Sequence, residues 1–186
     1  MYRFIALTLL FLTIFIGKVN IFAVEYKLPK GFHHYLAVEL NTKTWKLLEE
    51  NNRNKADEQR MVAFAHGSQY HWYKSANWKP INAQRGEWLL SHVYAVLKDA
   101  GKALEHAKKC LKKTKQLNLK GYDLAYAYEA MARAYAVSGN KMQYKKWYDL
   151  AEKYGNKIES ETDRNYFFKD LKKGPWLTNE KEGKKE

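Results

Sequence analysis

Residues 91–111, SHVYAVLKDAGKALEHAKKCL, align without a gap with residues 132–152, ARAYAVSGNKMQYKKWYDLAE, each position recurring 41 residues later. The tripeptide Tyr-Ala-Val at 94–96 is repeated at 135–137. Each copy has apolar residues at three- and four-residue steps, which is the spacing of one helix face, and each is interrupted by a short polar turn. A duplicated pair of helices predicts a repeat protein, in which every unit buries its apolar face against its neighbours.

Helical spacing extends beyond the duplicated unit, and no stretch shows the alternation typical of a strand. The 186 residues contain only three prolines and ten glycines, which favours long, uninterrupted helices. We therefore expect an all-α fold with about seven helices. They should cover approximately 33–51, 55–76, 82–98, 102–116, 123–138, 141–154 and 160–173.

The duplicated unit resembles the tetratricopeptide repeat (TPR). In that family a small residue and a tyrosine lie three positions apart on the first helix, and small or aromatic residues recur on the second. The matching residues are Ser91, Tyr94, Ala132 and Tyr135 on the first helices, and Ala103, Cys110, Tyr148 and Ala151 on the second. The resemblance implies a short right-handed solenoid of antiparallel helical hairpins.

This chain departs from the family pattern in three ways. Its repeat is 41 residues long instead of 34, with the extra residues in 112–121. Tyr144 stands where alanine is expected, and the usual closing proline is missing from both repeats. Residues 65–72 and 85–97 are also similar to small bacterial proteins of this repeat type. That likeness implies a fold and no activity.

These patterns divide the chain into seven parts. We expect a signal peptide at 1–23, a linker at 24–32, a degenerate N-terminal helical hairpin at 33–77, TPR-like repeats at 82–116 and 121–155, a C-terminal capping helix at 159–173, and a charged tail at 177–186.

The N-terminal segment has the pattern of a secretory signal. Arg3 precedes thirteen residues without a charge, and Ala23 offers a small residue at the cleavage position. The uncharged run is shorter than the roughly 20 residues of a membrane span. We expect export to the periplasm or the medium; the alternative is an uncleaved membrane anchor at residues 4–23.

The net charge of the chain indicates which kinds of partner it favours. The formal net charge of +13 favours acidic partners, and residues 102–120 hold seven lysines against the single Glu105. This lysine block is either a solvated helix face or a secondary docking surface for an acidic partner. It contains no arginine and no interleaved aromatic residues, so we expect no nucleic-acid binding.

One group of polar and aromatic residues interrupts the apolar helices. On a helix of 100° per residue, Arg85, Trp88 and His92 fall within about 60° of one another, apart from the apolar stripe. The TPR resemblance implies that the first helix of each hairpin lines a concave surface. The second repeat supplies Tyr126, Glu129 and Arg133 there, so the six residues predict a groove for a protein or peptide partner.

Three alternatives stay open. The six residues could instead pair with one another, since Glu129 lies four positions before Arg133. A second alternative is a metal-binding protein or enzyme that uses His66, His71, Glu87 and His92, with Tyr70 nearby. The third is a self-assembling structural module whose apolar ends stack on copies of itself.

The sequence gives little sign of catalysis. It has no glycine-rich phosphate loop, no nucleophile elbow and no known metal-ligand spacing. His66 and His71 are five residues apart, so they point about 140° from each other and cannot chelate one ion as an i,i+4 pair can. His33 and His34 are expected to face solvent. Cys110 is the sole cysteine and is expected in a packed interface. We therefore expect no cofactor, no metal and no catalytic residue; the oligomeric state stays open.

Overall fold

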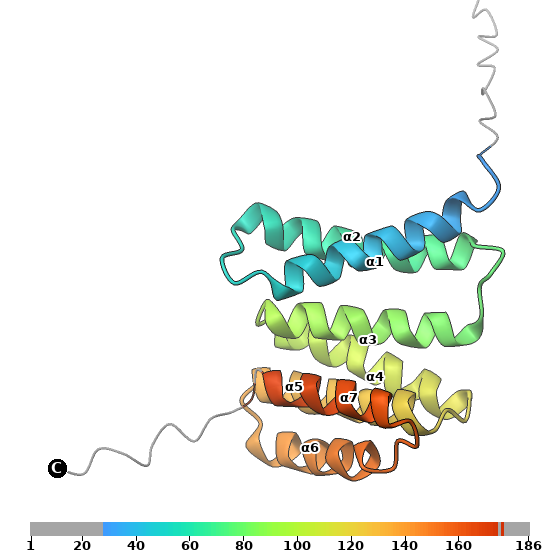
Figure 1. The fold of residues 1–186 in the computed structure, drawn as a ribbon. Helices are drawn as coiled ribbons and strands as arrows, with labels where there is room; N and C mark the ends of the chain where they lie inside the picture. Colours follow the sequence, from blue (N-terminus) through green and yellow to red (C-terminus); the bar gives the residue numbers. More distant parts are fainter. Residues whose placement is uncertain (1–27, 175, 177–186) are drawn as a thin grey trace, which may run out of the picture.

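The computed structural model describes residues 28–174 and residue 176 (Figure 1). These residues form seven α-helices and no strand, which confirms the all-α prediction. The helices are α1 (Phe32–Glu49), α2 (Lys55–Lys74), α3 (Pro80–Val96), α4 (Ala100–Gln116), α5 (Gly121–Val137), α6 (Lys141–Gly155) and α7 (Glu161–Lys173).

Three predicted segments lie wholly or partly outside the described residues: the signal peptide or anchor, the first part of the linker, and the charged tail. Within residues 28–174 and 176, no helix combines the length and apolar character needed to cross a bilayer.

Local sequence chemistry fixes where the helices start. The side chains of Asn54, Asp99, Asn140 and Ser160 each accept a hydrogen bond from the backbone N–H three residues on, at the starts of α2, α4, α6 and α7. At the start of α3, Pro80 occupies the first turn, where its missing N–H needs no partner.

The two turns inside the duplicated unit have the same geometry. Lys98 and Gly139, which are equivalent in the repeat, both have positive φ, at 60° and 75°. The next residue, Asp99 or Asn140, donates its backbone N–H to a carbonyl five residues earlier, at 2.9 and 3.1 Å. The same residue then caps the following helix through its side chain. The duplication in the sequence is therefore a structural duplication at these turns.

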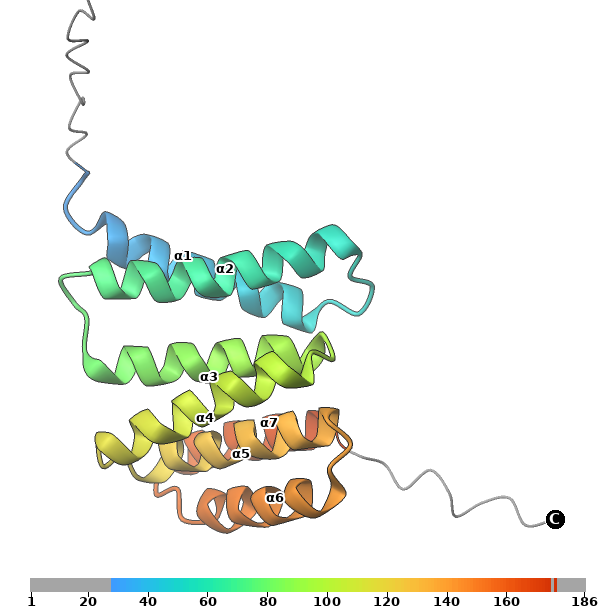
Figure 2. The ribbon, with the colours of Figure 1, turned by 180° about the vertical axis from the view of Figure 1, so that it is seen from behind.

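Successive helices pack against each other: α1 on α2, α3 on α4, and α5 on α6, with further contacts of α2 with α3, and of α5 with both α3 and α4. Figures 1 and 2, seen from opposite sides, show α1 and α3 on one face of the molecule and α2 and α4 on the other. The main apolar core lies between α2, α3, α4 and α5.

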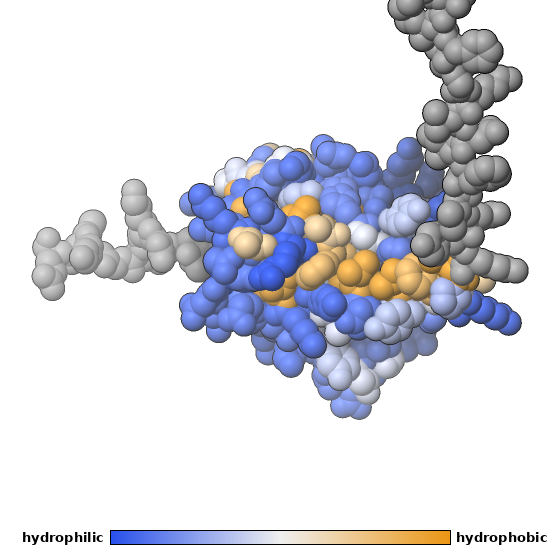
Figure 3. Space-filling model, turned by 90° about the horizontal axis from the view of Figure 1, so that it is seen from above, coloured by the Kyte–Doolittle hydropathy of each residue, from blue (hydrophilic) through white to orange (hydrophobic). Residues whose placement is uncertain are grey.

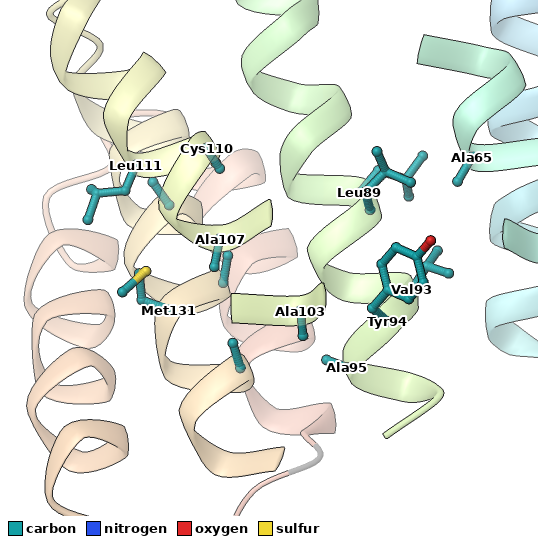
Figure 4. Packing of buried hydrophobic residues seen from close by; sticks show 14 of the residues in the cluster. Ala65, Leu89, Val93, Tyr94, Ala95, Ala103, Ala107, Cys110, Leu111 and Met131 are labelled. Atoms are coloured by element: carbon teal, nitrogen blue, oxygen red, sulfur yellow. The ribbon is translucent and has the colours of Figure 1, made fainter. Parts of the chain in front are cut away.

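Small side chains allow the inner helices to approach closely. Leu90 and Val93 of α3 are fully buried in this core, and the residues around them on α4 and α5 are mostly alanine (Figure 4). The buried small residues are Ala103, Ala107 and Cys110 on α4, and Ala127, Ala130 and Ala134 on α5. Such a core is close-packed because the helix backbones lie near one another, and bulky side chains contribute less to it.

The last helix forms as predicted, but it does not lie beyond α6 at the end of the row. It contacts α5 and α6, and Figure 1 shows it in front of α5. Phe167 of α7 is fully buried, with its ring perpendicular to that of Tyr126 at a centroid distance of 5.0 Å. Gly155 permits this contact, because a Cβ at that position would overlap the Phe167 ring. Helix α7 therefore covers the side of α5 that was predicted to line a groove.

Candidate functional site

Glu129 and Arg133, two of the predicted groove residues, form a buried ion pair. Their side chains are 0% and 1% exposed, respectively. Glu129 Oε1 accepts hydrogen bonds from Arg133 Nε, at 2.6 Å, and from Arg133 Nη2. The ring of Trp176 lies 5.0 Å from the guanidinium carbon. These two side chains have no surface left for a ligand, because α7 and Trp176 cover this part of α5.

Trp88 and Tyr126 join the same network. Trp88 donates its indole N–H to Glu129 Oε2 at 3.0 Å, and Tyr126 donates its hydroxyl to Asp170 Oδ2 of α7 at 2.8 Å. Burial and the Asp170 carboxylate raise the pKa of Tyr126 above its ordinary value, so the hydroxyl stays protonated and donates. Trp88 remains partly exposed, and its ring and the edge of Tyr126 can still reach a ligand.

Arg85 is the exposed cation of the predicted set. Its Nε and Nη2 atoms donate to the two oxygens of Asp123 at 2.9 and 3.2 Å, in the bidentate geometry typical of arginine. This hydrogen bonding raises the pKa of Arg85 further. The arginine side chain is 56% exposed, whereas Asp123 is 13% exposed. A ligand carboxylate can therefore approach Arg85 only by sharing it with Asp123.

His92 packs against two tryptophan rings that also contact each other. Its ring centroid is 5.7 Å from that of Trp45 and 5.5 Å from that of Trp88. Burial lowers the pKa of His92 well below its ordinary value, and the cations of Arg133 and Lys173 lower it further. The ring is therefore neutral at neutral pH. Its Nδ1 atom is buried and has no hydrogen-bond partner among the residues that the structure describes.

A cavity of about 300 Å³ opens over α3, beside the exposed parts of Arg85 and Trp88. Helices α1, α2, α3, α5 and α7 all contribute to its lining. The aromatic lining residues are Trp45, Trp72, Trp88, Tyr122 and Tyr126, and the polar ones include Asn41, Asn82, Asp123 and Asp170. The mixture of large aromatic faces and a few polar groups is typical of a ligand site.

A second cavity, of about 590 Å³, adjoins the first, since both are lined by Trp45 and Asp170. It continues past His92 and Val96 to Lys98 at the end of α3, between the α1–α2 loop and the end of α7. We refer to the two adjoining cavities as the α3 groove. Helix α3 contributes residues along the groove, α1 lines one side, and Asp170 and Lys173 of α7 line the other.

Sequence reasoning placed Arg85, Trp88, His92 and Tyr126 at the groove but missed most of its lining. Trp45 and Trp72 were not among the predicted groove residues. Asp170 of α7 gave no signal at all, because its role depends on where α7 docks.

Of the second set of candidates, the structure brings only His66 and Glu87 near each other, through their shared neighbour His106. His66 lies 3.1 Å from the Tyr94 hydroxyl, whereas His71 lies 2.7 Å from His33 and His92 packs against Trp45 and Trp88. Glu87, nearly buried, pairs instead with His106 at 2.8 Å. Tyr70 is exposed beside His71. Among the described residues, no three His, Cys, Asp or Glu side chains converge on a point that could hold a metal ion.

Cys110 is fully buried, as the sequence predicted. Burial raises the pKa of its thiol to about 12. The sulfur accepts a hydrogen bond from Gln84 Nε2 at 3.3 Å, and that same amide nitrogen donates to Thr114 Oγ1 at 3.0 Å. An inaccessible, protonated thiol is unsuited to nucleophilic chemistry.

Two surfaces lie outside the groove. In the lysine block, six lysines lie on α4 and Lys120 precedes α5, and all seven except the partly buried Lys113 are exposed. An apolar band crosses the end face formed by α1 and α2 (Figure 3). Exposed apolar residues on these two helices are Tyr35, Val38, Tyr70 and Tyr73.

Comparison with known proteins gives no relative: no protein-family model, no curated protein and no solved structure matches this chain.

Proposed function

We propose that this protein is a non-catalytic binding scaffold that holds a peptide segment of a partner protein in the α3 groove. The observation that carries the proposal is the groove itself, a pair of adjoining cavities of which the first is rich in tryptophan and tyrosine. Large, partly exposed aromatic faces beside a few polar groups are the features of surfaces that bind peptides tightly.

The proposed function includes a proposed arrangement of the helices. We infer a short right-handed solenoid of antiparallel hairpins, similar to tetratricopeptide repeats. Three features support it: the duplicated sequence, the matching turn geometry at Lys98 and Gly139, and the pairwise packing of successive helices. In this arrangement α1, α3 and α5 line one face, and α7 folds back onto α5 and narrows the binding surface to α3.

The length of α3 sets the size of the occupant. Seventeen residues of helix span roughly 25 Å at 1.5 Å per residue. An extended peptide rises about 3.3 Å per residue, so about seven residues fit along the groove. An aromatic or aliphatic side chain suits the first cavity, between Trp72 and Trp88. The net charge of +13 favours a partner that is acidic overall.

We propose that the protein is exported and acts in the periplasm or the medium. It rests on the N-terminal pattern of a basic residue, an uncharged run and a small residue at the cleavage position. Signal-peptide cleavage would be seen as a mature N-terminus near Val24 in protein recovered from the periplasm or the medium.

Peptide selection tests the binding proposal. A random twelve-residue display library is panned against the wild-type protein, and affinities of selected peptides are then measured by calorimetry. Trp72→Ala removes an aromatic wall of the groove, and we expect it to weaken binding by about tenfold or more. Trp78→Ala is the matched control, because Trp78 is 40% exposed and stacks on Tyr73 away from the groove. Equal loss in both variants, or loss in neither, would refute the groove as the binding site.

A second candidate function is self-assembly, and the apolar band over α1 and α2 favours it. A second copy of the chain would stack its own apolar face on Tyr35 and Val38, which are 63% and 46% exposed. Sedimentation velocity distinguishes the two functions. A mass that rises with concentration, and that Val38→Glu returns to the monomer, supports assembly; a monomer at all concentrations removes it.

A further inference from the structure

A pair of histidines joins the first turn of α1 to the last turn of α2. His33 Nδ1 and His71 Nδ1 lie 2.7 Å apart, although the residues are 38 positions apart in the chain. Their ring centroids are 4.9 Å apart. The sequence predicted that His33 would face solvent, but it is half-buried against this neighbour.

The contact requires the two rings to share one proton. One Nδ1 carries the hydrogen and donates it, and the other Nδ1 accepts with its lone pair. The accepting Nδ1 has a free lone pair, so that ring is neutral, and neutral imidazole is the form that binds metal ions.

A divalent transition-metal ion can replace the shared proton. If the donor ring moves its hydrogen from Nδ1 to Nε2, both rings keep one proton and both Nδ1 lone pairs point at the same place. No net proton is released. Two nitrogens bound 2.0–2.1 Å from one ion are roughly 2.9–3.4 Å apart, so the rings need to separate by only a few tenths of an ångström.

We propose that His33 and His71 form a two-histidine site for a divalent transition-metal ion, with Cu²⁺ the tightest and Zn²⁺ weaker. Imidazole suits both ions, and copper is the tightest-binding divalent ion of its series. Within the described residues no third ligand converges there, so water completes the coordination. The bound ion would tie the free ends of α1 and α2 together, which is a stabilising cross-link independent of the α3 groove.

Titration of the full, tag-free chain with CuCl₂ and, separately, ZnCl₂ tests the site by calorimetry. We expect one equivalent of Cu²⁺ to bind with micromolar affinity, and His33→Gln and His71→Gln each to weaken binding by about tenfold or more. His66→Gln is the matched control. His66 is an exposed histidine on α2, and its substitution should leave the affinity unchanged.

Two results would overturn the site: unchanged affinity in His33→Gln and His71→Gln, or no binding by the wild type at sub-millimolar ion. A loss confined to His66→Gln would place the ion elsewhere and count against the proposal equally. A folding defect in a variant cannot obscure the answer, because wild-type imidazole NMR signals are followed during the Zn²⁺ titration. Only the signals of His33 and His71 should shift.

Discussion

Replacing Glu129 with leucine removes the centre of the buried network between α3, α5 and α7. The carboxylate accepts three hydrogen bonds, two from Arg133 and one from the Trp88 indole N–H. Without it, the guanidinium of Arg133 stays in a site where 1% of its side chain is exposed. The cation then has neither water nor a counter-ion.

The expected loss of stability is large. Removing one partner of a buried ion pair costs about 3–5 kcal/mol, because it leaves an uncompensated charge. Domains of this size have unfolding free energies of about 5–15 kcal/mol, so Glu129→Leu should remove about a fifth or more of the total. The double variant Glu129→Leu, Arg133→Met removes both charges. It should remain within about 1–2 kcal/mol of the wild type, the residual cost being the unpaired Trp88 N–H.

Urea denaturation at neutral pH, followed by far-ultraviolet circular dichroism, measures all three proteins. The reasoning predicts a much lower midpoint for the single variant and recovery in the double variant. A single-variant loss below about 1 kcal/mol would show that Arg133 reaches solvent and that α7 does not cover it. A double variant no more stable than the single would show that the charge is not the cause of the loss.

Two further predictions concern pH and packing. The pKa values of His66, His71 and His92 are lowered in the folded chain, in each case mainly by burial. The unfolded chain therefore binds more protons than the folded chain near and below pH 6.5. The unfolding free energy should have its highest value above about pH 7 and should decrease as the pH drops toward 5. Urea midpoints that are equal at the two ends of this range would contradict the prediction. Gly155→Ala should destabilise by about 1–3 kcal/mol, because the added methyl displaces the ring of α7 that packs there. The control Gly101→Ala places its Cβ in ordinary contact, 3.6 Å from Asp99 Oδ1, and thermal melting should show it unchanged or slightly more stable.

The helices and the duplication could be predicted because both depend on patterns within short stretches of the sequence. Apolar spacing marks each helix, and the equivalence of Lys98 with Gly139 in the alignment reappears as the same left-handed backbone turn. Helix starts were predicted less well at α3 and α5, which were expected to begin near residues 82 and 123. They begin two residues earlier, at Pro80 and Gly121.

The groove was predictable only in part, because its shape depends on where α7 docks. The apolar face of α7 predicts that this helix packs against another helix, but it does not predict which one. Once Phe167 is seated against Tyr126, the predicted groove residues Glu129 and Arg133 become interior. For the same reason, Asp170 could not be recognised as a groove residue from the sequence.

Nitrogen-15 NMR of the tryptophan indoles tests the central proposal most directly. The chain has six tryptophans. Trp45, Trp72 and Trp88 line the α3 groove, whereas the other three lie outside it. A selected peptide titrated into the wild-type protein should shift the indole signals of these three groove residues and leave those of Trp78, Trp147 and Trp176 in place. Shifts confined to the second set would contradict binding in the α3 groove.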